Sequence, residues 1–459
     1  MRQFLGWALL AVLLGVPVAA QTPADTLELS LERALAIATG SNPGYRQAVN
    51  SAGLNPVEWR TTWFSEVLPQ AQVTLFQTQY TGNLTRRATD NFGNPIERPV
   101  TDWTYFSQTN QSLSLTWSIQ GASVAHALDR QRYANLDRTL AEDGARVSLG
   151  VSVRRAFWDV LEQRDLLRAE EALLQGRELD LEVARRLFGL AMRTRVDVLN
   201  AELAVEQQAL GLRQQRAARA QALLALRTEL GDEDLPPLRL TETPVPVFDP
   251  SSLSAEVLVA RALNVNPGIR RAEVAMRSAE VDRAASRRAW WPEFFLNYRL
   301  GRTAQTPEAE ALFDVSFDED LDQRFGVGLS IPMFTDYFGN RQEQHRASVA
   351  VQNRREEARA AELQTRQEVR AALLELENQH ESLRLAERSA EIAAEALRLA
   401  REEYRLGSRS FEDLRSAFDA EADTRRQVIQ ARHAFVDARL SLEEAVGAPV
   451  GPASGPSGG

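Results

Sequence analysis

Two long segments without proline, residues 123–188 and 339–404, constrain the fold of this chain more than any other feature. An α-helix rises about 1.5 Å per residue, so each segment can form a helix of about 100 Å. Seam residues recur in both segments with alternating spacings of four and three, as knobs-into-holes packing requires. The chain is therefore expected to be mainly α-helical, with long coiled coils.

The two segments share one pattern, because each seam position of the second lies 216 residues after its counterpart in the first. The first seam consists of Val153, Phe157, Val160, Arg164, Leu167, Glu171, Leu174, Glu178, Leu181, Arg185 and Phe188. The second consists of Val369, Leu373, Leu376, His380, Leu383, Glu387, Ala390, Ala394, Leu397, Arg401 and Tyr404. The polar interruptions fall at matching places, so the pattern indicates a tandem repeat.

Further motifs extend this repeat. An Asn-Pro-Gly turn at Asn42 and another at Asn266 each open a helical stretch. Shorter helices are expected to return along the long ones at residues 196–230 and 412–446. Each of these ends just before a glycine, Gly231 or Gly447, where a C-cap glycine belongs.

A run of prolines between residues 232 and 254 marks a linker between the two copies. The predicted organisation is therefore a first structural repeat at residues 21–231, the linker at 232–254, and a second repeat at 255–447. A flexible tail rich in Gly, Pro and Ser follows at 448–459.

Four short segments alternate between apolar and polar residues, as strands with one apolar face do. Their apolar positions are Ala71, Val73 and Leu75; Leu113, Leu115, Trp117 and Ile119; Phe294, Leu296, Tyr298 and Leu300; and Phe325, Val327, Leu329, Ile331 and Met333. In the first segment, Phe76 and Tyr80 fall on the other face. Alternating segments of about ten residues are typical of outer-membrane barrel strands. A small soluble sandwich is the alternative, which so few strands among so many helical residues disfavour.

Polar loops at residues 81–110 and 302–323 are expected to join paired strands and to face the outside of the cell. A barrel cannot close from these four strands alone, because open edges in hydrocarbon leave backbone groups unpaired at several kcal/mol each. Two copies of the chain would give eight strands and three would give twelve. The strands thus require an oligomer without fixing its number.

Residues 1–20 have the features of a signal peptide: a basic start at Arg2, an apolar run, and small residues before a cut ahead of Gln21. An uncleaved anchor is the alternative, but the run is too short to span a bilayer. We therefore expect an exported chain. After this segment no apolar run reaches about 18 residues, so no transmembrane helix is expected.

Composition argues against several function classes. The net charge is −10 and no basic block stands out, so nucleic acid is not an expected partner. The chain has no cysteine, which removes disulfides, thiol catalysis and Cys-based metal sites. The four histidines lack metal-ligand spacing, and no phosphate-binding loop or nucleophile elbow occurs. We expect neither an enzyme nor a cofactor.

Two copies of one motif stand at the expected tips of the hairpins. They are Phe-Gly-Leu-Ala-Met-Arg-Thr-Arg-Val-Asp at residues 188–197 and Tyr-Arg-Leu-Gly-Ser-Arg-Ser-Phe-Glu-Asp at 404–413. Together with the signal peptide, the tandem repeat and the order of strands and hairpins, these motifs make the chain resemble the TolC family of outer-membrane efflux proteins. The resemblance covers nearly the whole mature chain.

This resemblance implies a mainly α fold with a membrane β-barrel. Each protomer would supply four strands and two coiled-coil hairpins, and trimerisation would close the barrel in the outer-membrane lipid above a periplasmic helical tunnel. The family's partners are a periplasmic adaptor and an inner-membrane pump, in drug efflux or type I secretion. The competing interpretation is a periplasmic coiled-coil adaptor or scaffold without a pore, which the duplicated alternating strands disfavour.

The resemblance also assigns roles to tip residues. Asp197, Tyr404 and Arg409 match positions that hold the periplasmic entrance of the family closed, and Asp413 matches a constriction ring of aspartates. A second ring aspartate of the family is Ser416 here. The alternative is that Asp197 and Asp413 are N-cap or first-turn acids of the returning helices.

The positions at which adaptors dock in the family correspond to Leu190, Ala191, Arg193 and Thr194 on the first tip and to Leu406, Gly407 and Ser410 on the second. A plain helical-hairpin turn is the alternative for these residues. Two positions depart from the pattern. Ala191 replaces a glycine, which argues against a left-handed turn there, and Pro56 is expected to kink the first short helix.

Overall fold

The structure is a computed structural model that describes residues 27–89, 92–120, 123–241, 247–288, 290–306, 321–331, 333 and 335–450. The predicted signal peptide and most of the predicted tail lie outside these residues. The chain divides into two compact units. The hairpin unit comprises residues 1–43, 149–248 and 378–440, and the sheet unit comprises residues 44–148, 249–377 and 441–459.

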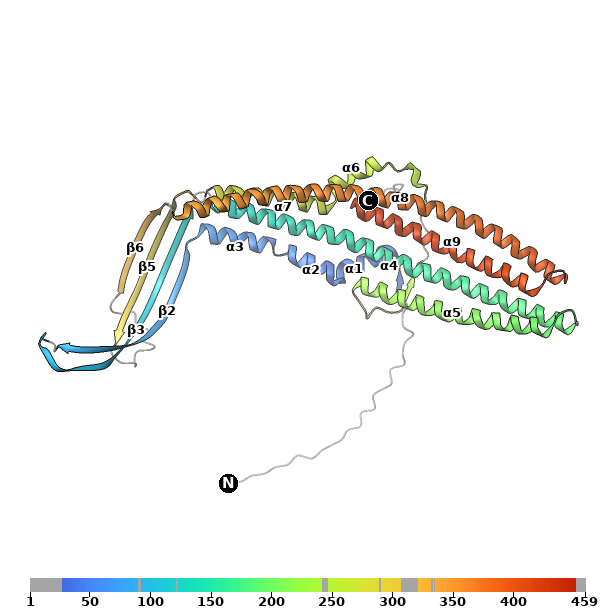
Figure 1. Cartoon of the computed structure of the whole chain (residues 1–459), viewed down its shortest axis with the longest axis horizontal. Helices are drawn as coiled ribbons and strands as arrows, with labels where there is room; N and C mark the ends of the chain where they lie inside the picture. Colours follow the sequence, from blue (N-terminus) through green and yellow to red (C-terminus); the bar gives the residue numbers. More distant parts are fainter. Residues whose placement is uncertain are drawn as a thin grey trace, which may run out of the picture. The chain divides into compact units, whose positions relative to one another are not determined.

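The four longest helices have nearly the predicted bounds. They are α4 (Ser123–Gly189), α5 (Arg195–Leu230), α8 (Thr335–Arg405) and α9 (Phe411–Val446). Figure 1 shows α4 and α5 as one helical hairpin and α8 and α9 as a second. Among the described helices, none has an apolar stretch long enough to cross a membrane.

In the hairpin unit, the helices contact one another through buried polar side chains as well as through apolar side chains. Glu170 of α4 is buried and accepts hydrogen bonds from Gln208 of α5 and from Arg426 of α9. Because a buried carboxylate is costly unless it is paired, this arrangement favours one register among the three helices.

A short helix, α1 (Leu31–Ser41), and a two-stranded parallel sheet complete the hairpin unit. The strands β1 (Leu27–Leu29) and β4 (Leu238–Leu240) pair from Leu27 opposite Leu238 to Leu29 opposite Leu240. The sequence pattern does not predict this sheet.

Each Asn-Pro-Gly turn lies next to one of the C-cap glycines and hydrogen-bonds to the helix that this glycine ends. The side-chain amide of Asn42 donates to the carbonyl of Glu229 (2.9 Å) in the last turn of α5, beside Gly231. In the sheet unit, Asn266 donates in the same way to Ala445 (3.1 Å) in the last turn of α9, beside Gly447. Both glycines have the predicted left-handed backbone, with φ of 74° and 76°. Each asparagine thus satisfies a helix-end carbonyl that would otherwise lack a partner.

The sheet unit contains a four-stranded antiparallel sheet in the order β2-β3-β5-β6. Its strands are β2 (Gln70–Thr89), β3 (Pro95–Gln120), β5 (Glu293–Thr306) and β6 (Leu321–Ser330). They include the four predicted segments, except that Ile331 and Met333 follow the end of β6. In this order β2 and β6 are the two edges of the sheet.

The register places the predicted apolar residues on one face. Leu115 lies opposite Tyr298, which lies opposite Phe325, while the neighbouring row joins Thr116 to Asn297. The apolar residues of β6 are exposed in the single chain. The sheet therefore has an apolar face and a face rich in serine, threonine and asparagine.

The predicted loops are too long. β2 and β3 stay paired up to Arg87 opposite Val100, so most of residues 81–110 is strand, and β5 and β6 include parts of residues 302–323. A register shift between Thr74 and Gln77 explains the error, since a bulge changes which face the following side chains occupy. Tyr80, opposite Ser107, therefore shares a face with Val73, opposite Leu113, although the two differ in parity.

Helices precede both pairs of strands. In the first half α2 (Pro43–Ala52) and α3 (Asn55–Val67) are separate helices, whereas α6 (Ala255–Val265) leads to one continuous helix, α7 (Pro267–Arg287). A single turn of 3₁₀-helix, η1 (Pro250–Ser252), precedes α6.

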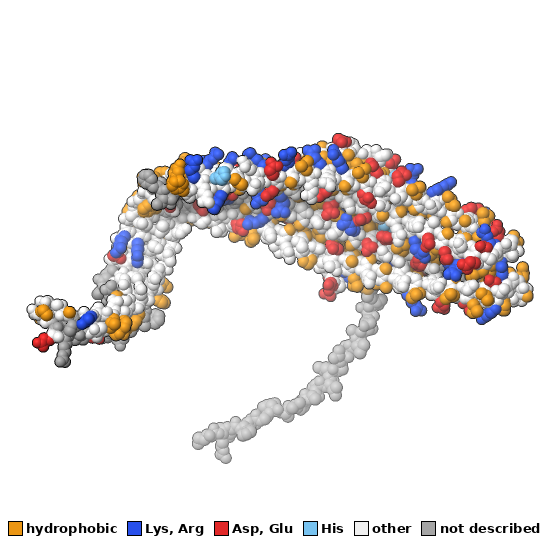
Figure 2. All heavy atoms as spheres, in the orientation of Figure 1, with side chains coloured by type: hydrophobic (Ala, Val, Ile, Leu, Met, Phe, Trp, Pro, Cys, Tyr) orange, Lys and Arg blue, Asp and Glu red, His pale blue; other side chains and the backbone are white. Residues whose placement is uncertain are grey.

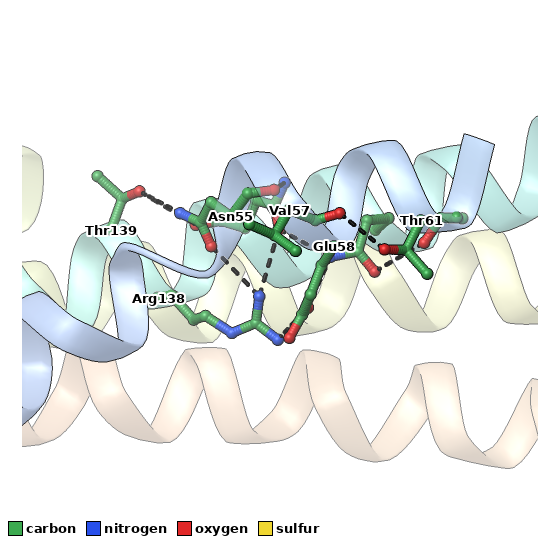
Figure 3. Close-up of polar contacts among 9 residues, drawn as sticks. Asn55, Val57, Glu58, Thr61, Arg138 and Thr139 are labelled. Atoms are coloured by element: carbon green, nitrogen blue, oxygen red, sulfur yellow. Dashed lines mark hydrogen bonds and ion pairs between the residues drawn. The ribbon is translucent and has the colours of Figure 1, made fainter. Parts of the chain in front are cut away.

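Pro56 lies in the first turn of α3, and the break before it agrees with the predicted kink. Figure 3 shows how α3 is attached to α4 beyond the break. The Asn55 amide donates to Thr139 (3.4 Å), Arg138 donates to the Asn55 side-chain carbonyl (3.2 Å), and Arg138 also pairs with Glu58.

Candidate functional site: the tips of the two helical hairpins

Both tips adopt the same turn. After α4 the amide of Met192 donates to the carbonyl of Leu187 (2.9 Å), and after α8 the amide of Ser408 donates to Glu403 (3.1 Å). The residue inside each turn is left-handed: φ is 55° at Ala191 and 79° at Gly407. Ala191 thus adopts the left-handed conformation that its replacement of a glycine argued against. The turn forms despite a penalty of roughly 1 kcal/mol for a side chain there.

The tip acids cap the returning helices. The backbone amide of Thr194 donates to the Asp197 carboxylate (3.0 Å), and the amide of Asp197 donates to the Thr194 hydroxyl (3.3 Å). The second tip repeats this capping box, with distances of 3.3 Å for the Ser410 amide and 3.2 Å for the Asp413 amide. Hydrogen bonds from the Ser410 hydroxyl and amide hold the pKa of Asp413 below its usual range. Two amides that a helix start leaves unpaired are thus satisfied at each tip.

Tyr404 lies in the apolar core beneath the tips, where it is 1% exposed. Its neighbours in this cluster include Leu173 of α4, Ala201 of α5 and Phe411 of α9, whose ring centroid is 6.1 Å away. Its hydroxyl has no hydrogen-bond partner among the described residues. Burial raises the pKa of this hydroxyl, so it remains a neutral donor.

Arg193 connects the two tips. Its guanidinium carbon lies 4.4 Å from the centre of the Tyr404 ring, and the group donates to the backbone carbonyls of Tyr404 and Arg409. A planar cation over an aromatic face with two carbonyl acceptors is a geometry that arginine provides and lysine does not. Sequence reasoning placed Arg193 at the tip but not in this contact, which depends on the spatial approach of two distant hairpins.

The three residues expected to form a closing link do not bond to one another within the chain. Asp197 is engaged with Thr194, and Arg409 forms an ion pair with Glu403 (3.1 Å). The negative charge of Asp197 helps to raise the pKa of the buried Tyr404 hydroxyl, without a hydrogen bond between the two side chains. The gating role of these residues stays a prediction.

The outer surface of the tips combines apolar and charged side chains. Leu406 is 80% exposed, Leu190 69% and Met192 55%. Figure 2 shows hydrophobic side chains interspersed with Arg, Asp and Glu over the helical hairpins. The tips therefore present exposed apolar side chains beside charged ones.

Comparison with known proteins agrees with this architecture. Residues 258–448 match the family model of the outer membrane efflux proteins. The fold matches that of CusC, with a TM-score of 0.72 at 17% identity over 94% of this chain and 96% of CusC. It also matches the Campylobacter jejuni CmeC outer membrane channel, with 0.68 at 15% identity over 91% and 85%. The Neisseria gonorrhoeae MtrE outer membrane channel gives 0.67 at 18% identity over 91% and 89%. No curated protein sequence matches the chain.

The strands, the hairpins and their paired tips thus define the fold of an outer-membrane channel protomer. Residues 258–448, which include the second tip motif, are similar to the outer membrane efflux proteins, in agreement with the resemblance of the tip motifs to the TolC family.

Proposed function

We propose that three copies of this chain form a channel that exports small molecules or proteins across the outer membrane, together with a periplasmic adaptor and an inner-membrane pump. The observation that carries this proposal is the sheet β2-β3-β5-β6, which has one apolar face and two free edges. In lipid these edges require partners, and the β2 edge of one copy can pair with the β6 edge of the next. Three copies give a twelve-stranded barrel, with the serine- and threonine-rich face toward a lumen.

Aromatic residues at the end of the sheet next to the helices support a membrane boundary there. Trp63 and Phe64 stand near the end of α3, and Trp291 and Phe338 flank β5 and β6; all four are exposed. Aromatic girdles mark the interface of outer-membrane barrels. We infer that the barrel ends at these residues and that the helices continue in the periplasm.

We further propose that residues 21–231 and 255–447 are structural repeats that supply the tunnel wall with two similar hairpins per protomer. In this arrangement the exposed leucines of the tips face the adaptor, together with Ala191, Arg193, Thr194, Gly407 and Ser410.

The proposed gate consists of Asp197, Tyr404 and Arg409, with Asp413 as a ring charge. The partnerless hydroxyl of Tyr404 supports the gate, because it leaves a donor that a small rearrangement of the tips could satisfy. Replacing Tyr404 with Phe and Arg409 with Ser should raise single-channel conductance in planar bilayers. Conductance equal to that of the wild type would assign both residues to packing of the hairpin tip.

The channel itself is tested by two measurements on the full chain. Light scattering in detergent should give the mass of a trimer, and membrane fractionation should place the protein in the outer membrane with resistance to alkaline wash. A monodisperse monomer that keeps its full strand content would contradict the barrel. Release by alkaline wash would favour the adaptor or scaffold instead.

A further inference from the structure

A large open cavity lies in the hairpin unit between α4, α5 and α9. Its volume is about 930 Å³, which is within the range of small-molecule sites. Its walls include Trp158 and Glu162 of α4, Glu229 of α5, and His433 and Asp437 of α9. This cavity is far along the helices from the tip residues described above.

One wall of the cavity is aromatic and apolar. Trp158 is buried, and its ring centroid lies 6.2 Å from that of His433. Val436 and Leu440 of α9 continue this wall. These side chains are almost completely buried, so the wall offers a hydrophobic ligand apolar contact but no open ring face.

The remaining wall carries an excess of negative charge. Four carboxylates, those of Asp159, Glu162, Glu229 and Asp437, stand against one cation, Arg155. Arg155 is bound to Asp437 (2.6 Å), and Glu229 accepts from the Ser152 hydroxyl (2.7 Å). Glu162 is partly buried, and this burial raises its pKa because the charged carboxylate loses part of its solvation by water.

His433 adds an unsatisfied polar group to the same wall. It is only 6% exposed, and neither ring nitrogen has a hydrogen-bond partner among the described residues. The nearest acid, Asp165, is 3.7 Å from Nε2. An imidazole nitrogen that is buried at a cavity without a partner is costly unless a ligand or water satisfies it.

The cavity and the small sheet β1–β4 lie on opposite faces of α4. Residues 155, 159 and 162 line the cavity, whereas residues 160, 164 and 167 line the pocket beneath β4. At 100° per residue these two sets point in opposite directions. Strands on the inner face of a tunnel would obstruct it, so the face with β1 and β4 is the outer one and the cavity opens toward the lumen.

We propose that this cavity binds a protonated aromatic amine on its passage through the channel. The aromatic body lies against the apolar wall that includes Trp158, the ammonium group lies among Glu162 and Asp159, and its N–H donates to a ring nitrogen of His433. The excess of carboxylates in the wall favours a positive charge. This inference rests on the proposed function, because it takes the cavity face as the lumen side.

The test uses the full-length protein in detergent and the probe proflavine, a flat protonated aminoacridine. Fluorescence anisotropy measures its binding, with the anionic dye fluorescein as a probe of similar size and opposite charge. Glu162→Gln and Asp159→Asn each remove one cavity carboxylate. Glu178→Gln removes an exposed carboxylate of α4 outside the cavity and is the matched control.

We expect saturable binding of proflavine and none of fluorescein. Each cavity variant should weaken proflavine binding by about tenfold, as for the loss of a charge-assisted hydrogen bond, and Glu178→Gln should leave it within about twofold of the wild type. Unchanged affinity in both cavity variants, or equal binding of both dyes, would overturn the site. Conductance and oligomeric mass are measured on the same samples. Absent binding in a conducting trimer rejects this site alone, whereas a monomer without conductance rejects the channel.

Discussion

Removal of the Arg193 side chain should loosen the two hairpin tips from each other. Arg193 belongs to the turn between α4 and α5, yet all its described contacts are with the second tip: the ring and carbonyl of Tyr404 and the carbonyl of Arg409. Arg193→Ala therefore removes the polar contacts that this turn makes with the second tip, without touching either capping box.

The magnitude follows from the two kinds of interaction that this substitution removes. A cation–π interaction at a partly exposed site contributes about 0.5–1 kcal/mol. A hydrogen bond from a charged donor contributes roughly 1.5 kcal/mol, and the hydrogen bond to the Tyr404 carbonyl at 3.5 Å is too long to add much. The sum is about 2 kcal/mol, or a rise of about 30-fold in the equilibrium constant for local opening of the tips.

Hydrogen–deuterium exchange of the wild type and variants in detergent measures this opening. The amides of residues 404–413 should exchange about 30-fold faster in Arg193→Ala. Arg409→Ala is the control, because it removes only the exposed ion pair with Glu403, which contributes roughly 0–1 kcal/mol. If the two variants exchange at the same rate, Arg193 does not hold the tips together.

Three further predictions follow from particular contacts. Gly231→Ala should lower the midpoint of thermal unfolding far more than Gly407→Ala. Both glycines are left-handed, but a Cβ at Gly231 would lie 2.6 Å from the Asn42 Cα, whereas a Cβ at Gly407 would lie 3.8 Å from the Met192 side chain. Equal losses of stability would show that backbone strain alone matters. Glu162→Gln should raise the midpoint of thermal unfolding at pH 7, because burial raises the pKa of Glu162 and its charged form therefore destabilises the fold. This gain in stability should shrink as the pH falls toward 4.5, the ordinary pKa of a glutamate, and vanish below it. A gain that stays constant with pH would show that Glu162 does not have a raised pKa. Arg409→Glu should impair efflux while immunoblots show a normal amount of the protein. Arg193→Glu should impair efflux and also reduce the amount of protein, because it breaks the connection between the tips. Normal efflux in both variants would show that the tips are not part of the adaptor interface.

The sequence was sufficient to predict the helical framework. A segment without proline that repeats its seam at spacings of four and three has few alternatives to one long helix, and α4 and α8 begin and end within a few residues of prediction. Local chemistry likewise determined the caps, because Thr194, Ser410 and the glycines after α5 and α9 act on residues only a few positions away.

What could not be predicted depends on long-range contacts. β1 and β4 are three residues each, too short for a periodic pattern, and they form because α5 returns residues 238–240 to the side of residues 27–29. The bulge after Thr74 shifts the alternation of side chains in β2, so the alternating pattern did not predict the second half of this strand. The contact of Arg193 with Tyr404 joins residues 211 positions apart, and no local rule connects them.

The remaining question at the tips is whether Asp413 is a cap or a ring charge, and its geometry allows both. A carboxylate has about four acceptor positions, and the capping box occupies only those directed at the Ser410 amide and hydroxyl. The lowered pKa means that the carboxylate stays ionised, so three symmetry-related copies would still present a ring of negative charge. Asp413→Asn separates the two roles, because its amide oxygen can still accept from Ser410 while the charge is removed. We expect Asn to reduce cation preference in planar bilayers with normal amide protection at the start of α9, and Ala to reduce both. If Asn keeps the wild-type selectivity, the carboxylate serves the helix alone.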